Sequence, residues 1–220
     1  MPKQFNIRKV ARDFLWRFSI GKSIVAGREL TPFLKSKGWF LSVDQNRPVD
    51  RNGDCLPWYT YAMITFLTER VTAEMSIFEY GSGNSTLWWS RRVSHVTSCE
   101  HDRHWYEEIK SKVPGNVNYL FRDSNAEGSY SKAIMDYNQA FDCIVIDGAD
   151  RVDCARNCLD ALKPDGVIIW DNTEIDDYRE GYAFLVSRGF KRLDFWGLGP
   201  FNPYEWCTSI FYKEINCLGI

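Results

Sequence analysis

The stretch IFEYGSGNSTLWWS, residues 77–90, decides the fold of this 220-residue chain. Residues 76–80 are a short apolar run, which is typical of a buried strand. A turn with Gly81 and Gly83 follows, and residues 85–92 have helical spacing with a polar residue in place to cap them. Glycines allow a tight turn close to a ligand, and the start of a helix offers unpaired N–H groups. The stretch predicts the first strand, turn and helix of a nucleotide-binding α/β sheet.

After this unit the chain alternates strands and helices to its end, which favours a mostly parallel, doubly wound sheet. Further strands are expected at residues 95–100, 117–121, 141–147, 167–170, 191–196 and 208–213. Helices are expected at residues 56–70, 102–112, 151–162 and 176–188. The strand-forming domain therefore occupies residues 56–220, and residues 1–55 are an N-terminal extension that ends in a polar loop at 41–54.

Charge is divided unevenly between these two parts. Residues 1–40 hold nine basic and two acidic side chains, or +7, so the remainder holds 18 basic and 27 acidic ones, or −9. The acidic body lacks the basic face that phosphate backbones require, and no nucleic-acid partner is expected. Apolar residues at 7, 10, 14, 15 and 18 give the basic extension the spacing of an amphipathic helix. Such a helix binds an anionic membrane or an acidic partner, or packs on the acidic body, which is the interpretation we favour.

The cysteines and the apolar runs bear on the compartment. The seven cysteines are an odd number without a zinc-ligand spacing, and we interpret them as reduced thiols. The longest uncharged run, residues 55–68, is too short to span a bilayer, and no signal peptide is evident. These features predict a cytoplasmic protein. The oligomeric state is not predicted.

Acidic side chains stand at the carboxyl ends of four predicted strands: Glu100, Asp123, Asp147 and Asp171. Ligands of open α/β sheets bind outside these ends. One acidic strand end is ordinary, because Asp and Asn often cap the next helix. Four of them in register with a glycine turn indicate a ligand site.

Three motifs, EYGSGNS (79–85), FDCIVIDG (141–148) and LKPDGVIIWDN (162–172), carry a family resemblance. With these motifs, residues 56–213 resemble the class I S-adenosylmethionine-dependent methyltransferases. The resemblance implies a Rossmann-like sheet of about seven strands, with an antiparallel last strand and helices on both faces. A dehydrogenase is disfavoured, because Thr86 replaces the third glycine of the dinucleotide fingerprint.

The resemblance also implies a set of site residues for S-adenosylmethionine. The methionine part is expected beside Glu79 and the glycine turn, the ribose at Glu100, and the adenine at Asp123. The full set of implied cofactor-binding residues is Glu79, Gly81, Gly83, Ser85, Glu100, His101, Asp123, Ser124 and Asp147.

The motifs IDG (146–148) and WDN (170–172) narrow the resemblance to cation-dependent O-methyltransferases. That resemblance implies that Asp147, Asp171 and Asn172 hold a divalent cation such as Mg²⁺, which prefers oxygen ligands. The alternative is that the three side chains only cap helices and bind loops. Those enzymes place a lysine three residues after the first Asp, where this chain has Asp150 followed by Arg151. We take Asp147 and Asp150 as the catalytic candidates.

Residues 197–206, between the last two predicted strands, are expected to cover the acceptor. Phe201, Tyr204 and Trp206 supply flat faces, and Asn202 and Glu205 supply hydrogen bonds. This composition suits a saccharide or another small polar metabolite, and we expect O-methylation of a hydroxyl group. A cofactor-binding relative without activity and an aminopropyl transferase of the polyamine-synthase type remain alternatives.

Overall fold

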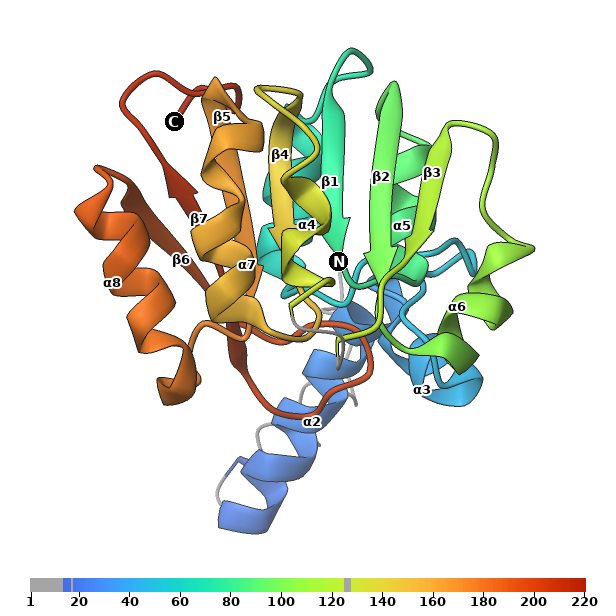
Figure 1. Ribbon diagram of the computed structural model, residues 1–220. Coiled ribbons are helices and arrows are strands. Elements are labelled where there is room, and N and C mark those ends of the chain that lie inside the picture. The colour runs from blue at the N-terminus through green and yellow to red at the C-terminus, as the bar shows by residue number, and fades with distance from the viewer. Residues whose placement is uncertain (1–13, 17, 125–127) are drawn as a thin grey trace.

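Within residues 14–16, 18–124 and 128–220, which the computed structural model describes, seven strands form one sheet in the order β3-β2-β1-β4-β5-β7-β6 (Figure 1). They are β1 Ser76–Tyr80, β2 His95–Glu100, β3 Val117–Phe121, β4 Phe141–Ile146, β5 Leu162–Asp171, β6 Lys191–Gly197 and β7 Trp206–Tyr212. Strand β7 pairs antiparallel with β5 and β6, and the other pairs are parallel. The predicted Rossmann-like sheet with one antiparallel strand is confirmed.

Helices cover both faces of the sheet. They are α4 Tyr61–Arg70, α5 Asn84–Ser90, α6 Arg103–Lys110, α7 Arg151–Asn157 and α8 Arg179–Ser187, with 3-10 turns at Ser131–Ile134, Leu159–Ala161 and Asp176–Tyr178. Side chains alternate along each strand, so the central strands supply two separate cores. Tyr80 and Ile144 pack in the core that includes α7 and α8, whereas Ile77 and Val145 pack in the core that includes α4 and α5.

The carboxyl end of β1 lies at the switch point of the sheet. The chain continues from β1 to β2 on one side, whereas β4 and β5 lie on the other. Loops that leave β1 and β4 therefore diverge and open a crevice between them, where open α/β sheets bind their ligands.

Helix α4 is shorter than the helix predicted at residues 56–70, because it begins at Tyr61. The Thr60 hydroxyl accepts a hydrogen bond from Met63 N at 3.3 Å and caps the helix there. Residues 56–60 instead run across the carboxyl-end edge of the sheet, and Tyr61 N donates to Leu198 O at 2.8 Å.

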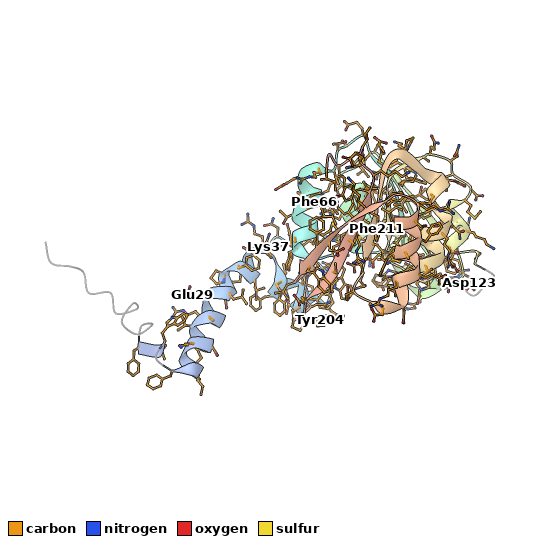
Figure 2. The ribbon with its side chains drawn as sticks, turned by 90° about the vertical axis from the view of Figure 1, so that its left-hand side faces the viewer. Glu29, Lys37, Phe66, Asp123, Tyr204 and Phe211 are labelled. Atoms are coloured by element: carbon orange, nitrogen blue, oxygen red, sulfur yellow. The ribbon has the colours of Figure 1, made fainter. Side chains whose placement is uncertain are left out.

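In the described part of the N-terminal extension, helices α2 Ser19–Ser36 and α3 Trp39–Gln45 precede this domain. Helix α2 projects away from the body of the protein at the carboxyl-end edge of the sheet (Figures 1 and 2). The packing that we expected concerns the predicted helix over residues 7–18, and it stays a prediction. Much of the predicted 7–18 helix lies outside the described residues. None of the helices in the described part of the chain combines the length and the hydrophobicity needed to cross a bilayer.

Residues 39–55, which precede the predicted domain boundary, are in contact with the body of the protein. Helix α3 occupies the start of the segment that was predicted to be a loop, and Trp39 Nε1 donates to Asn202 O at 3.2 Å. After α3 the chain returns to the sheet, where Asn84 Nδ2 donates to Pro48 O at 2.6 Å. These contacts place residues 46–48 beside the glycine turn.

Candidate functional site

A cavity of about 520 Å³ opens at the carboxyl-end edge of the sheet. It is lined by the turn after β1, by the ends of β4 and β5, by the β6–β7 loop and by the N-terminal segment. The lining residues are Asn46, Arg47, Pro48, Trp58, Ser82, Gly83, Asn84, Ser85, Trp105, Asp147, Arg151, Asp171, Asn172, Asn202, Tyr204 and Trp206. The cavity thus joins the predicted cofactor turn to the predicted acceptor loop.

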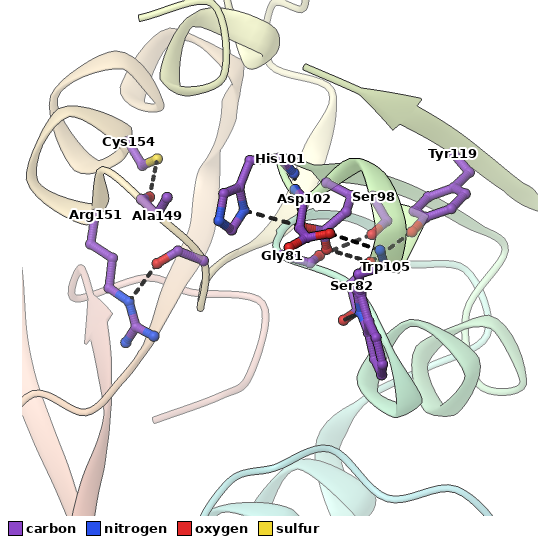
Figure 3. A network of polar contacts seen from close by, with 12 residues as sticks. Gly81, Ser82, Ser98, His101, Asp102, Trp105, Tyr119, Ala149, Arg151 and Cys154 are labelled. Carbon is purple, nitrogen blue, oxygen red and sulfur yellow. Dashed lines mark hydrogen bonds and ion pairs between the residues drawn. The ribbon is translucent and has the colours of Figure 1, made fainter. Parts of the chain in front are cut away.

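The glycine turn approaches the end of β4 closely. Gly81 has φ +93°, and a Cβ built on it would lie 2.8 Å from the carbonyl oxygen of Asp147. Gly83 has φ +151°, and a Cβ on it would lie 3.4 Å from the ring of Trp105. Trp105 Nε1 in turn donates to Ser82 O at 2.8 Å (Figure 3). Gly81 is therefore required by backbone shape and by space, whereas Gly83 is required by backbone shape.

Glu79 lies behind this turn instead of facing the cavity. Its side chain is buried, and its Oε2 accepts hydrogen bonds from the hydroxyls of Thr86 and Ser98. Burial raises the pKa of Glu79 to about 7, against the opposing effect of nearby hydroxyls. Its contacts support the end of the turn where helix α5 begins, and Glu79 does not line the cavity. Its predicted contact with a cofactor stays a prediction.

Glu100 stands at the end of β2 with both carboxylate oxygens engaged. Oε1 accepts from the backbone N–H groups of His101 and Asp102 at 2.8 and 2.9 Å, and Oε2 accepts from the Ser82 hydroxyl at 2.6 Å. The Ser82 hydroxyl also lies 2.8 Å from the hydroxyl of Tyr119 (Figure 3). Glu100 is thereby fixed beside the turn. The partner of its Oε2, the Ser82 hydroxyl, belongs to a side chain that can rotate.

The other predicted adenine-side residues lie farther along the same edge. His101 is half-buried, and its ring lies 5.2 Å from that of Tyr130. Asp123 is exposed after β3, and its carbonyl accepts from the Ser129 hydroxyl at 2.7 Å. Ser124 follows immediately, next to residues outside the described range. None of these three lines the cavity as described.

The ends of β4 and β5 are joined by Arg151, the first residue of α7. Its Nε donates to Gly148 O at 2.9 Å, the contact drawn at Arg151 in Figure 3. Its Nη2 donates to Asp147 Oδ1 at 3.1 Å. Its Nη1 donates to the backbone oxygen of Asp171 and, at 3.3 Å, to Asn172 Oδ1. The predicted trio is therefore brought together, but around a guanidinium group.

Burial disfavours the ionised form of both carboxyls in this cluster. It raises the pKa of Asp147 to about 6, against the opposing charge of Arg151. Burial also raises the pKa of Asp171 well above its usual range, and the neighbouring Asp147 adds to this effect. Asp171 Oδ1 accepts from Trp206 Nε1 at 3.1 Å and from the Thr208 hydroxyl, which fix the carboxyl against β7.

Asp150 does not join this cluster. It is exposed, has φ +47° at the start of α7, and does not line the cavity. Its left-handed backbone turns the chain so that the next side chain, that of Arg151, reaches back to Asp147. The residue that contacts Asp147 is therefore Arg151 and not Asp150.

Aromatic rings form the opposite wall of the cavity. Trp58 packs on Phe201 with ring centroids 4.6 Å apart, and Tyr204 contacts Trp206 edge-on at 6.3 Å. Tyr204 is 61% exposed, whereas Trp206 is buried. The β6–β7 loop thus covers the cavity as expected.

The chain was compared with known protein families, curated proteins and solved structures. Residues 78–173 match a protein family described as a methyltransferase domain. The chain has the fold of the class I methyltransferases. The sequence matches no curated protein.

Several solved structures share this methyltransferase fold. The precorrin-6y C5,15-methyltransferase from Geobacter metallireducens matches with a TM-score of 0.54 at 16% identity, over 70% of this chain and 87% of that one. A protein assigned as an O-methyltransferase from Klebsiella pneumoniae matches with a TM-score of 0.53 at 21% identity, over 73% and 84%. A spermidine synthase bound to a transition-state analogue matches with a TM-score of 0.50 at 15% identity, over 70% of this chain and only 58% of that enzyme. At these identities the similarity establishes the fold alone.

The residues at the turn fit the cofactor that this methyltransferase fold binds. Gly83 and Ser85 line the cavity, and the absence of a side chain at Gly83 leaves a backbone cradle below the Trp105 ring. Glu100 beside Ser82 supplies a fixed carboxylate of the kind that accepts hydrogen bonds from ribose hydroxyls. Of the predicted cofactor residues, Gly83, Ser85 and Asp147 line the cavity, and Gly81 shapes the turn.

The predicted divalent cation does not fit. The Arg151 guanidinium lies among the groups that would coordinate it and donates to Asp147 Oδ1, Asn172 Oδ1 and the backbone oxygen of Asp171. One carboxylate oxygen of Asp171 is bound by Trp206 and Thr208. Among the described residues, no group of three or more His, Cys, Asp or Glu side chains is placed to hold a metal ion. The sequence interpretation missed Arg151, although its position four residues after Asp147, one helical turn away, was a usable signal.

Proposed function

We propose that this protein transfers a methyl group from S-adenosylmethionine to a hydroxyl group of a small polar acceptor, with a saccharide as the favoured class. The observation that carries the proposal is the single cavity that contains Gly83, Asp147 and Tyr204. A cofactor held at the glycine turn and an acceptor held under the β6–β7 loop would meet at Asp147. S-adenosylmethionine, when bound, supplies an electrophilic methyl group on a sulfonium.

The protein's own contribution is to position the acceptor and to remove its proton. Asp147 Oδ1 is held by Arg151, and Oδ2 has no hydrogen-bond partner among the described residues. The side chain retains 22% of its exposure and lines the cavity, so Oδ2 is available to a hydroxyl group there. With a pKa of about 6, the carboxyl is mostly ionised at neutral pH and suits a general base.

The acceptor class is inferred from the opposite wall. Trp58 and Tyr204 offer partly exposed aromatic faces, and Asn202 and Asn46 offer amide groups between them. Flat apolar faces next to hydrogen-bonding groups match a sugar ring, which has apolar C–H faces and a hydroxyl rim. Arg47 adds one positive charge at the mouth of the cavity, which suits an acceptor carrying a phosphate or carboxylate.

The proposal is tested by incubating the full-length protein with S-adenosylmethionine and a panel of acceptors, followed by mass spectrometry of both products. The panel contains free sugars, sugar phosphates, nucleotide sugars, catechols and hydroxy acids. We expect S-adenosylhomocysteine and a methyl ether on one of the sugar derivatives. Methylation of catechol alone would contradict the acceptor class, and aminopropyl transfer from decarboxylated S-adenosylmethionine would contradict the reaction.

A further inference from the structure

Arg151 has the environment of a bound cation. Its side chain is 11% exposed, and four of its N–H groups donate to oxygen atoms from two different strand ends. These acceptors are Gly148 O, Asp147 Oδ1, Asp171 O and Asn172 Oδ1. A guanidinium has five N–H donors in a rigid planar fork, so one N–H on Nη2 has no partner in the described part of the chain.

Carboxylate, amide and backbone oxygens are also the ligands that Mg²⁺ and Ca²⁺ prefer. Both kinds of cation cannot occupy the cluster together, because the guanidinium already takes the oxygens and would repel a divalent ion. The charge of Arg151 is permanent at any physiological pH, whereas a metal ion binds reversibly.

We propose that the Arg151 guanidinium is the resident cation of this site and takes the place of a divalent metal ion. It closes the gap between the ends of β4 and β5, and it holds one oxygen of Asp147 while the other faces the cavity. Its effect on turnover rests on the proposed function, but the exclusion of metal does not, so the two are tested separately.

Metal exclusion is tested by titrating Mn²⁺ into the full-length, EDTA-treated protein and following free Mn²⁺ by electron paramagnetic resonance. We expect no stoichiometric binding by the parent or by Arg151→Lys, which keeps a charge in the site. Arg151→Ala exposes the oxygen cluster, and we expect this variant to bind one Mn²⁺ ion. The double variant Arg151→Ala with Asp147→Asn should lose that binding. The matched control is Arg156→Ala, because Arg156 lies on the same helix and pairs with Asp153 and Glu180 at the surface.

Two results would overturn the proposal. One is Mn²⁺ binding by the parent protein that is lost in Asp147→Asn. The other is a folded Arg151→Ala variant that binds no Mn²⁺, since the oxygens would then not form a cation site. If Arg151→Ala does not fold, Asn172→Asp adds a carboxylate while keeping the arginine, and Mn²⁺ binding by this variant would also contradict the proposal. Cofactor titration of each variant with S-adenosylhomocysteine reports separately on the proposed function.

A second inference concerns helix α2, whose apolar side chains face solvent. Ile20, Ile24, Leu30 and Phe33 are each between 46% and 77% exposed. At about 100° per residue these four lie within an arc of about 180° on the helix. The preceding aromatic residues Phe14, Trp16 and Phe18 are exposed as well.

Basic residues border this apolar face. Arg28 and Lys35 lie at one side of the arc and Lys22 at the other, and Glu29 is the acidic residue of α2. Within the described residues, these three cations form no ion pair with the body. Together with the +7 charge of residues 1–40, this arrangement matches an anionic surface.

The place of α2 adds a reason for a membrane. Helix α2 leaves the body at the edge of the sheet where the cavity opens (Figure 1). Helix α3 follows α2 in the chain and leads to residues 46–48, which line the cavity. Figure 2 shows Glu29 and Lys37 along the projecting helix, with Tyr204 of the cavity loop near its base. We propose that the apolar face of α2 docks on an anionic lipid bilayer and brings the cavity to the membrane surface.

This docking is tested by sedimenting the full-length protein with vesicles of phosphatidylcholine, with and without phosphatidylglycerol. We expect binding to the anionic vesicles that weakens as salt is added. Ile24→Ser with Phe33→Ser, and separately Lys22→Glu with Arg28→Glu, should each weaken binding about tenfold or more. The controls are Ile215→Ser and Arg179→Glu, which alter exposed side chains on the body.

Absence of binding to anionic vesicles would overturn the docking proposal, as would equal binding to neutral ones. The oligomeric state is measured in the same samples by light scattering. A concentration-dependent dimer that Ile24→Ser with Phe33→Ser abolishes would identify a second copy, and not a bilayer, as the occupant of this face.

Discussion

Arg151 Nη2 donates to Asp147 Oδ1 at 3.1 Å, across the single helical turn that separates the two residues. The ion pair engages one carboxylate oxygen of Asp147, a side chain that lines the cavity, and the other has no hydrogen-bond partner among the described residues. Arg151 also connects the end of β4 to the end of β5, since the same guanidinium binds Asp171 O and Asn172. Asp147 and its support thus come from two segments of the chain, residues 147–151 and residues 171–172.

Asp147→Asn is expected to reduce methyl transfer by about 10²- to 10⁴-fold, the usual contribution of a general base. The amide keeps the size of the carboxyl, so affinity for S-adenosylhomocysteine should change little. Asp150→Asn is the control, because Asp150 is exposed outside the cavity, and its activity should equal that of the parent. The rate with EDTA should match the rate without it. An Asp150→Asn defect as large as that of Asp147→Asn would return Asp150 to the site.

Gly81→Ala is expected to destabilise the protein more than Gly189→Ala. Both glycines have left-handed backbones, with φ of +93° and +85°, so alanine costs about 1–2 kcal/mol at either position. A Cβ at Gly81 also meets Asp147 O at 2.8 Å, whereas a Cβ at Gly189 meets nothing within 4 Å. Urea denaturation should therefore give a larger loss for Gly81→Ala, together with weaker cofactor binding. Equal losses of unfolding free energy for the two variants would contradict the close approach of Gly81 to the end of β4.

The pH dependence of stability should report on Glu79. Burial raises the pKa of Glu79 to about 7 from an ordinary value of 4.5, so the folded protein takes up a proton before the unfolded chain does as pH falls. Stability from this group is therefore present at low pH and is lost as pH rises through about 4.5 to 7. The loss is about 3–4 kcal/mol, since the two pKa values differ by 2.5 and each pKa unit corresponds to about 1.4 kcal/mol.

Glu79→Gln isolates this contribution, because the other buried carboxyls are unchanged in it. Its free energy of unfolding should rise relative to that of the parent between about pH 4.5 and pH 7. The surface variant Glu108→Gln, which alters an exposed pair with Lys112, should show no comparable trend. A difference between Glu79→Gln and parent that stays constant with pH would place an ionised Glu79 in the folded state.

Tyr204→Ala should weaken use of the acceptor while leaving cofactor affinity intact, because Tyr204 is exposed at the cavity and forms no part of the glycine turn. We expect a higher KM for the acceptor and a smaller effect on kcat. Trp206→Ala is a poorer test, since Trp206 is buried and donates to Asp171, and its loss should cost about 3–5 kcal/mol of stability. Unchanged KM in Tyr204→Ala would leave the β6–β7 loop with a packing role only.

The sequence predicted the sheet closely because strands and turns leave local signals. The first three strands begin and end where their apolar runs do, and the positive φ of Gly81 is the reason for a glycine there. Strand β5 is longer than expected, since it starts at Leu162 and includes Pro164 beside its partner β4. Pairing between strands extends an element beyond what its own residues favour.

The site was predicted less completely, because its contacts join residues distant in the sequence. Glu79 is the first residue of the EYGSGNS motif (79–85), but its side chain contacts Thr86 and Ser98 behind the turn. Residues 46–48 have no periodic signal, and only their return to Asn84 reveals them as part of the cavity wall. The carboxylates at the strand ends suggested a metal ion, whereas the counter-cation is the neighbouring Arg151.

The most direct test of the central claim is a calorimetric titration of S-adenosylhomocysteine into the full-length protein and into Glu100→Ala. Glu100 is fixed beside the glycine turn by Ser82 and two backbone N–H groups. The parent should bind one equivalent, and Glu100→Ala should bind about 10- to 100-fold more weakly, as expected for lost hydrogen bonds to a charged group. No binding by the parent, or equal affinity in both proteins, would contradict a cofactor site at the end of β1 and β2.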